Sequence, residues 1–164
     1  MKTLFIGGIK SGKSRLAEVF ILKSTTNKPY YLATTEFIDQ EMQQRIASHQ
    51  QRRQDKFITI EEPLHLSRAI KDCPGAILIE CMSMWLNNML YHQHTDDQIF
   101  HELTEALALP NDLVFVINEV GLGVIADNPL VRQFVDLSGR VAQLLAAQCD
   151  QVYLCSAGLK IKLK

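Results

Sequence analysis

Short apolar runs recur along the chain, and longer segments with apolar residues at helical spacing separate them. A run that is apolar on both faces is typical of a strand in a parallel sheet that helices cover on both sides. The pattern therefore predicts an α/β fold with a mostly parallel sheet. We expect strands at 3–6, 29–35, 57–61, 76–81, 113–117 and 151–155.

The segments between these runs carry apolar residues three or four positions apart, as amphipathic helices do. We expect helices at 14–23, 37–53, 64–71, 84–91, 97–109 and from residue 129 onward. Asn128-Pro129 is a good helix start, because Asn accepts a hydrogen bond from a free N–H and Pro fits the first turn. One side of this last helix should carry Leu130, Val131, Phe134, Val135, Val141, Leu144 and Leu145.

The end of the chain has a different pattern. Residues 159–164 alternate apolar and basic side chains, which indicates an edge strand with one face in water, and we allow for it to be antiparallel. There is no linker, domain boundary or internal repeat, so we interpret residues 1–164 as a single domain.

Composition narrows the classes of function. The hydrophobic fraction of 47 % is enough for a full core, and a net charge of -1 predicts no general attraction to nucleic acid or anionic membranes. No apolar run approaches the roughly 20 residues of a membrane span, and the N-terminal run is too short for a signal peptide. We therefore expect a cytoplasmic protein.

Cysteines and histidines do not form a metal-binding pattern. The four cysteines contain no CxxC pair, and in a reducing compartment we expect them to be small buried residues. His92, His94 and His101 lack the cysteines that would complete a zinc site. A polar surface is the better interpretation of this stretch.

Residues 7–14 read GGIKSGKS and fit the phosphate-loop pattern G-x-x-x-x-G-K-[ST]. Glycines let the backbone bend so that successive N–H groups point at phosphate oxygens, and the following helix adds its positive end. Lys13 would reach the β and γ phosphates, and Ser14 would bind Mg²⁺. An apolar strand precedes the motif and an amphipathic helix follows it, which favours a P-loop NTPase (RecA-like) fold over a chance Gly-rich turn. The predicted nucleotide-binding residues here are Gly7, Gly8, Ile9, Lys10, Ser11, Gly12, Lys13 and Ser14.

Glu80 stands at the end of the apolar strand at 76–81. An acidic residue at such a strand end in P-loop proteins usually assists the magnesium ion or its waters, which gives Ser14 and Glu80 as the predicted metal residues. A strand-end carboxylate that only faces solvent is the alternative.

Four segments together identify a family. The first is GG-x-x-SGKSR-x-AE at 7–18, and the second is YLAT at 31–34 followed by EM-x-x-RI-x-x-H-x-x-x-R at 41–53. The third is ECMSMW-x-x-N at 80–88, and the fourth is NEVG-x-G at 118–123 with its continuation to residue 141. In this order they cover nearly the whole chain, which resembles the bifunctional adenosylcobinamide kinase / adenosylcobinamide-phosphate guanylyltransferase family. A proline and a tryptophan common in the family are replaced by Gln54 and Phe57.

The resemblance implies two reactions in cobalamin biosynthesis. ATP or GTP first phosphorylates the hydroxyl on the aminopropanol arm of adenosylcobinamide, and GTP then donates GMP to that phosphate. The family passes through a histidine-bound GMP, and the matching residue here is His49. The family also forms a trimer, so the resemblance implies a homo-oligomer. The implied catalytic residues are His49 and Lys13.

His49 is also chemically suited to this role. An imidazole with its ordinary pKa of about 6.5 is largely neutral, and so nucleophilic, near neutral pH. Attack on the α-phosphate would give a phosphoramidate that passes GMP on, so one hard transfer becomes two easier ones. Arg53 would share its helix face and steady phosphate charge. Without the family pattern, His49 would be interpreted as an ordinary surface histidine.

Further nucleotide contacts are implied by the same resemblance. A carboxylate suits guanine, whose N1–H and N2–H₂ groups are adjacent donors, and Glu61 holds the family position. The sequence does not distinguish whether Glu61 or its neighbour Glu62 makes this contact. The implied contacts beyond the phosphate loop are Ala33, Thr34, Thr35, Gln50, Gln51, Arg52, Arg53, Glu61 and Glu80.

Two other functions remain to be compared with this one. A monofunctional P-loop small-molecule kinase would not need His49 and would form no covalent GMP-enzyme. A nucleotide-switched binding protein would need a guanine-specificity motif such as N-K-x-D, which the sequence lacks.

Overall fold

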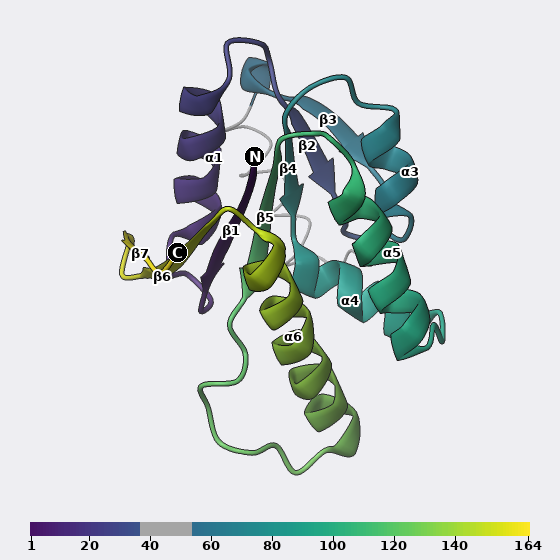
Figure 1. Cartoon of the computed structure of the whole chain (residues 1–164). Coiled ribbons are helices and arrows are strands. Elements are labelled where there is room, and N and C mark those ends of the chain that lie inside the picture. The colour runs from purple at the N-terminus through teal and green to yellow at the C-terminus, as the bar shows by residue number, and fades with distance from the viewer. Residues whose placement is uncertain (37–53) are drawn as a thin grey trace.

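A seven-stranded sheet organises the computed structural model, which describes residues 1–36 and 54–164 (Figure 1). The strand order is β3-β2-β4-β5-β1-β6-β7, and every neighbouring pair is parallel except β6 and β7. The strands are β1 (Lys2–Gly7), β2 (Tyr30–Ala33), β3 (Ile58–Glu61), β4 (Ile77–Glu80), β5 (Leu113–Asn118), β6 (Gln151–Ser156) and β7 (Leu159–Lys162). This confirms the predicted P-loop α/β class with an antiparallel C-terminal edge strand.

Helices cover both faces of this sheet. Helix α1 lies on one face, and α3, α4, α5 and α6 lie on the other (Figure 1). The helices are α1 (Lys13–Ser24), α3 (Leu66–Lys71), α4 (Met82–Tyr91), α5 (Asp96–Ala108) and α6 (Pro129–Gln148), with a 3-10 turn η1 (Gln54–Lys56). The helix predicted at 37–53 lies outside the described residues.

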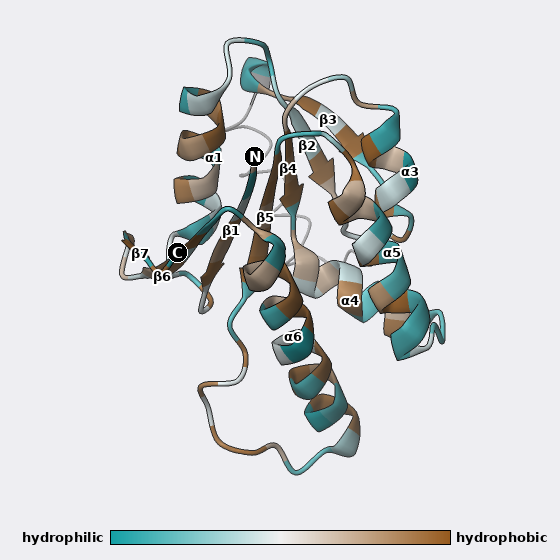
Figure 2. Cartoon of the chain, viewed as in Figure 1, coloured by the Kyte–Doolittle hydropathy of each residue, from teal (hydrophilic) through white to brown (hydrophobic). Residues whose placement is uncertain are grey.

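The strands supply side chains to two cores, one on each face. In β1, Leu4 joins the cluster under α3 to α6 that contains Trp85, whereas its neighbour Phe5 joins the cluster under α1. Figure 2 shows that the central strands β1, β4 and β5 are apolar along most of their length. Alternate residues of each central strand are therefore buried on opposite faces, which is why the strands are continuous apolar runs.

Helix α6 begins as predicted, and its later turns bury part of the predicted apolar side, including Val141 and Leu145. The side chain of Asn128 accepts a hydrogen bond from the Leu130 N–H at 2.8 Å, and Pro129 occupies the first turn. Leu130 and Val131 are 72 % and 45 % exposed, so the predicted apolar side is not buried in the first turn. The first turns of α6 extend beyond the carboxyl ends of the strands, where no sheet covers them (Figure 1). The buried residues are Leu137, Ser138, Val141 and Leu145.

The edge strand β7 pairs antiparallel with β6, but the prediction of one water-facing side was wrong. Its apolar residues Leu159 and Ile161 are 73 % and 62 % exposed. The Lys160 Nζ lies 4.3 Å from the centroid of the Tyr153 ring and also stands over Phe5 and Phe20. Cation–π attraction and the apolar lysine stem account for this contact.

The cysteines are buried as predicted at three of the four positions, Cys73, Cys149 and Cys155, whereas Cys81 is partly exposed. All four are free thiols, and burial raises the pKa of Cys149 to about 12. His92 contacts the carboxylate of Glu36 at 2.9 Å, and residues 1–36 and 54–164 contain no group of three or more His, Cys, Asp or Glu that could hold a metal. In the same residues, no helix has the length and apolar character needed to cross a bilayer.

Candidate nucleotide site

The phosphate loop joins the end of β1 to the start of α1. The Gly8 carbonyl accepts hydrogen bonds from the Ser11 N–H and from the Lys13 Nζ, both at 3.2 Å. The N-cap residue Gly12 provides no side-chain cap, and the first turn of α1 contains no acidic residue. The N–H groups at the positive end of α1 are thus left to bind an anion such as phosphate.

Two glycines of the loop are required by its surroundings. A Cβ on Gly7 would lie 2.4 Å from the Cys155 carbonyl oxygen, which no side chain tolerates. Gly12 has φ of 91°, and its Cβ would lie 3.0 Å from the Cα of Gly158. The Gly158 N–H donates to the Ser11 carbonyl at 2.9 Å, so the β6–β7 turn supports the loop from outside. Sequence analysis missed this support, although a glycine before the alternating run was a turn signal.

Ser14 and Glu80, the predicted metal pair, are in contact beside the loop. The Ser14 hydroxyl, in the first turn of α1, donates to Glu80 Oε1 at the end of β4 over 2.7 Å. Both residues are half-buried. A hydroxyl and a carboxylate so placed are oxygen ligands of the kind Mg²⁺ takes in P-loop proteins, so the residues present fit this ion.

The segment after β2 is locked to the end of β4. The Thr34 N–H donates to the Glu80 carbonyl at 3.1 Å, and the Thr34 hydroxyl donates to the Cys81 carbonyl at 2.8 Å. The same hydroxyl accepts from the Cys81 N–H at 2.9 Å. Thr34 is fully buried, whereas its neighbours Ala33 and Thr35 are partly exposed. The Thr34 side chain therefore holds the segment in place, and its neighbours are the ones open to a ligand.

Glu61 and Glu62, which sequence could not separate, have different surroundings. Glu62 Oε1 accepts hydrogen bonds from the N–H groups of Leu64 and His65, both at 2.9 Å. Glu61 is exposed at the carboxyl end of β3, and its carboxylate makes no hydrogen bond or ion pair within the described residues. The carboxylate open to a ligand is consequently that of Glu61.

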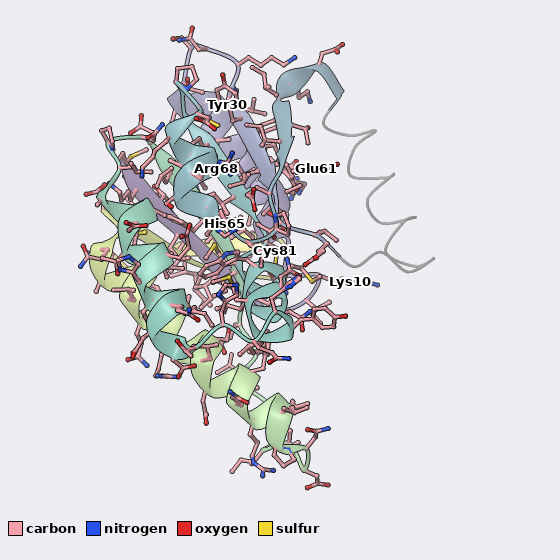
Figure 3. The ribbon with its side chains drawn as sticks, turned by 90° about the vertical axis from the view of Figure 1, so that its right-hand side faces the viewer. Lys10, Tyr30, Glu61, His65, Arg68 and Cys81 are labelled. Carbon is pink, nitrogen blue, oxygen red and sulfur yellow. The ribbon has the colours of Figure 1, made fainter. Side chains whose placement is uncertain are left out.

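These groups lie along one edge of the sheet. Figure 3 places Glu61 at one end and Lys10 of the phosphate loop at the other, with Cys81 between them. Four strand spacings separate β3 from β1, a distance of about 19 Å. A ligand that touches both ends must lie across the carboxyl ends of β5, β4 and β2.

Cys81 directly follows Glu80 at this edge (Figure 3). Burial raises its pKa, with a smaller contribution from the nearby Glu80 carboxylate. The thiol therefore stays protonated near neutral pH and is a poor nucleophile. The predicted nucleophile and its neighbours, His49, Gln50, Gln51, Arg52 and Arg53, lie outside the described residues.

The turn at 118–123 lies next to the phosphate loop, where open α/β sheets place ligands. The Glu119 N–H donates to the Gly7 carbonyl at 3.0 Å, and Glu119 Oε1 accepts from the Gly121 N–H at 2.7 Å. A cavity here of about 30 Å³ is too small for a nucleotide. A larger hollow of about 560 Å³ is lined by residues of α6 alone and by none of the predicted site residues.

Comparison with known proteins agrees with this geometry. Residues 3–163 match the CobU family, described as cobinamide kinase / cobinamide phosphate guanyltransferase. The chain is 38 % identical over 172 residues to the bifunctional adenosylcobalamin biosynthesis protein CobP of Pseudomonas aeruginosa, covering 100 % of this chain and 98 % of that protein. It is 33 % and 35 % identical to the CobU proteins of Escherichia coli and Salmonella typhimurium, each over 183 residues and the full length of both chains.

A solved structure supports the fold alone. The flagellar accessory protein FlaH of Methanocaldococcus jannaschii superposes with a TM-score of 0.50 at 12 % identity, covering 99 % of this chain and 77 % of that one.

Proposed function

The chain belongs to the cobinamide kinase / cobinamide phosphate guanyltransferase family, and we propose that its one phosphate loop serves both reactions in turn. It phosphorylates cobinamide and then transfers a guanylyl group to cobinamide phosphate. The family match over residues 3–163 carries this conclusion, and the names of the relatives favour adenosylcobinamide as the corrinoid substrate.

In the first step the substrate hydroxyl attacks the γ-phosphorus of a nucleoside triphosphate, the nucleoside diphosphate leaves, and the hydroxyl proton is released. Lys13 and the loop N–H groups hold the phosphates. In the second step His49 attacks the α-phosphorus of GTP and pyrophosphate leaves. The phosphate of the corrinoid then attacks the phosphoramidate, which gives adenosylcobinamide-GDP and frees the histidine.

Mg²⁺ belongs to this proposal, with Ser14 and Glu80 as the residues that hold it. Their contact at 2.7 Å beside the loop supports this role. The ion would neutralise charge on the phosphate oxygens when bound.

Replacing Ser14 with Ala should raise the Mg²⁺ concentration needed for half-maximal kinase activity by at least about tenfold, since one oxygen ligand is lost. The measurement is an Mg²⁺ titration of initial rates at saturating nucleotide. Ser24→Ala, at the exposed end of the same helix, is the matched control and should leave the titration unchanged. An unchanged titration for Ser14→Ala would remove Ser14 from the metal site.

Glu61 is proposed to accept hydrogen bonds from the guanine N1–H and N2–H₂ groups, with the partly exposed Ala33 and Thr35 beside it. The Glu61 carboxylate is exposed and has no partner in residues 1–36 and 54–164, which supports this assignment. The proposal further includes a cytoplasmic location, a single domain for both reactions, and a trimer of identical subunits.

The overall test is to follow the corrinoid products by mass spectrometry. With adenosylcobinamide, ATP, GTP and Mg²⁺, we expect adenosylcobinamide phosphate first and then adenosylcobinamide-GDP with one equivalent of pyrophosphate. Accumulation of the phosphate as the final product would instead indicate a monofunctional kinase.

A further inference from the structure

Asn88 is a fully buried asparagine in α4, within the Trp-x-x-Asn pattern that the two reactions leave unexplained. A buried amide is costly unless its polar atoms are hydrogen-bonded, so its partners indicate its purpose. Its Nδ2 donates to the Thr34 carbonyl at 2.6 Å and to the Pro63 carbonyl at 3.1 Å. Both acceptors are carbonyl oxygens, so only the amide nitrogen can face them.

These two carbonyls belong to different strand ends of the nucleotide site. Thr34 directly follows β2, and Pro63 comes two residues after Glu61, the last residue of β3. One side-chain amide therefore joins the Ala33–Thr35 segment to the loop that follows Glu61.

A second side chain of the same helix acts on the same loop. The indole Nε1 of Trp85 donates to the Leu64 carbonyl at 2.8 Å, and Trp85 is fully buried. Helix α4 thus binds two consecutive carbonyls, those of Pro63 and Leu64. Inside this loop Glu62 accepts from the backbone, and the Glu62 N–H donates to the Ala33 carbonyl at 3.0 Å.

The contacts form a continuous path from the phosphate loop to the far strand. Ser14 contacts Glu80, the Thr34 N–H bonds the Glu80 carbonyl, and Asn88 joins Thr34 to the loop after Glu61. The backbone of Glu61 is held by the ladder between β2 and β3, and Asn88 adds the link that fixes the loop directly after it. The position of the Glu61 carboxylate relative to the phosphates therefore depends in part on Asn88.

We propose that Asn88, assisted by Trp85, is the positioning residue that sets guanine specificity. It holds the loop that follows Glu61 at a fixed distance from the phosphate loop. This inference rests on the proposed contact of Glu61 with guanine. Asn88 does not touch the nucleotide, so its loss should impair recognition of the base more than binding of the phosphates.

The test measures equilibrium affinities for the α,β-methylene analogues of GTP and ATP, in which the α–β bridge cannot be cleaved. Asn88→Asp keeps the size of the side chain but lacks the two N–H donors. We expect its GTP-analogue affinity to fall about tenfold, the equivalent of one hydrogen bond, with ATP-analogue affinity nearly unchanged. Asn87→Asp is the matched control, since Asn87 is exposed on the same helix, and should change neither.

Trp85→Phe is the second variant and keeps the proposal testable if Asn88→Asp does not fold. It removes only the indole donor to Leu64 and part of the ring, and the GTP-to-ATP affinity ratio should fall in the same direction. A purely structural role would lower the melting temperature and both affinities together. An unchanged affinity ratio in the folded variants would overturn the positioning role.

Glu61→Ala separates this inference from the proposed function. If Glu61→Ala leaves the affinity ratio unchanged, the guanine contact itself is wrong and the positioning role fails with it. If Glu61→Ala lowers the ratio and neither Asn88→Asp nor Trp85→Phe does, only the positioning role is overturned.

Discussion

Replacement of Lys13 with Met should reduce kcat of the kinase reaction by about 10²–10³-fold, or about 2.7–4 kcal/mol of transition-state stabilisation. Lys13 is 7 % exposed, and its ammonium lies 3.2 Å from the Gly8 carbonyl inside the phosphate loop. It is thereby oriented toward the place where the β and γ phosphates would lie. Methionine keeps most of the apolar stem and removes the charge, so the fold should persist.

The measurement is the initial rate of each step with purified protein, assayed separately on adenosylcobinamide and on its phosphate. Guanylyl transfer should fall as well, because we propose that the same loop holds GTP. Lys23→Met, which removes an exposed lysine at the end of the same helix, should leave both rates unchanged. Near-normal rates in Lys13→Met would show that the loop does not bind the reacting nucleotide.

Replacement of His49 with Ala should abolish guanylyl transfer, by more than about 10³-fold, while the kinase rate stays within about threefold of wild type. The two steps separate because only the second uses the histidine as a nucleophile in the mechanism that we propose. The measurement is conversion of adenosylcobinamide phosphate to adenosylcobinamide-GDP, beside the kinase assay on the same preparation. His101→Ala, at an exposed position on α5, is the control. Equal loss of both activities would mean that His49 serves folding or general nucleotide binding.

The central part of the fold was predictable because its signals are local. The strands around residues 77–80 and 113–118 are buried on both faces, and only a covered parallel sheet makes such runs. The phosphate loop was also predictable from its sequence. Gly7 is required because the Cys155 carbonyl lies close to it, and Gly12 because its φ is positive. The contact of Ser14 with Glu80 followed from the motif and the strand end together.

The surroundings of other side chains could not be predicted, because the spacing of apolar residues along the chain does not show which residues pack against them. Periodicity placed Leu130 on the apolar side of its helix, but nothing in the described residues covers that turn. Alternation assigned Lys160 to water, where it is exposed, but did not predict that its ammonium also lies over three aromatic rings from β1, α1 and β6. The different surroundings of Glu61 and Glu62 depend on which carboxylate the Leu64 and His65 N–H groups reach, and sequence does not show this.

Covalent labelling by GTP is the most direct test of the claim that one chain is both a kinase and a guanylyltransferase. Wild type and His49→Ala are incubated with GTP labelled at the α-phosphate and Mg²⁺, denatured, and assayed for bound label. The account predicts label on wild type that is stable in base and lost in acid, as for a phosphoramidate, and none on His49→Ala. Folded wild type that binds GTP but takes up no label would contradict the guanylyl transfer step.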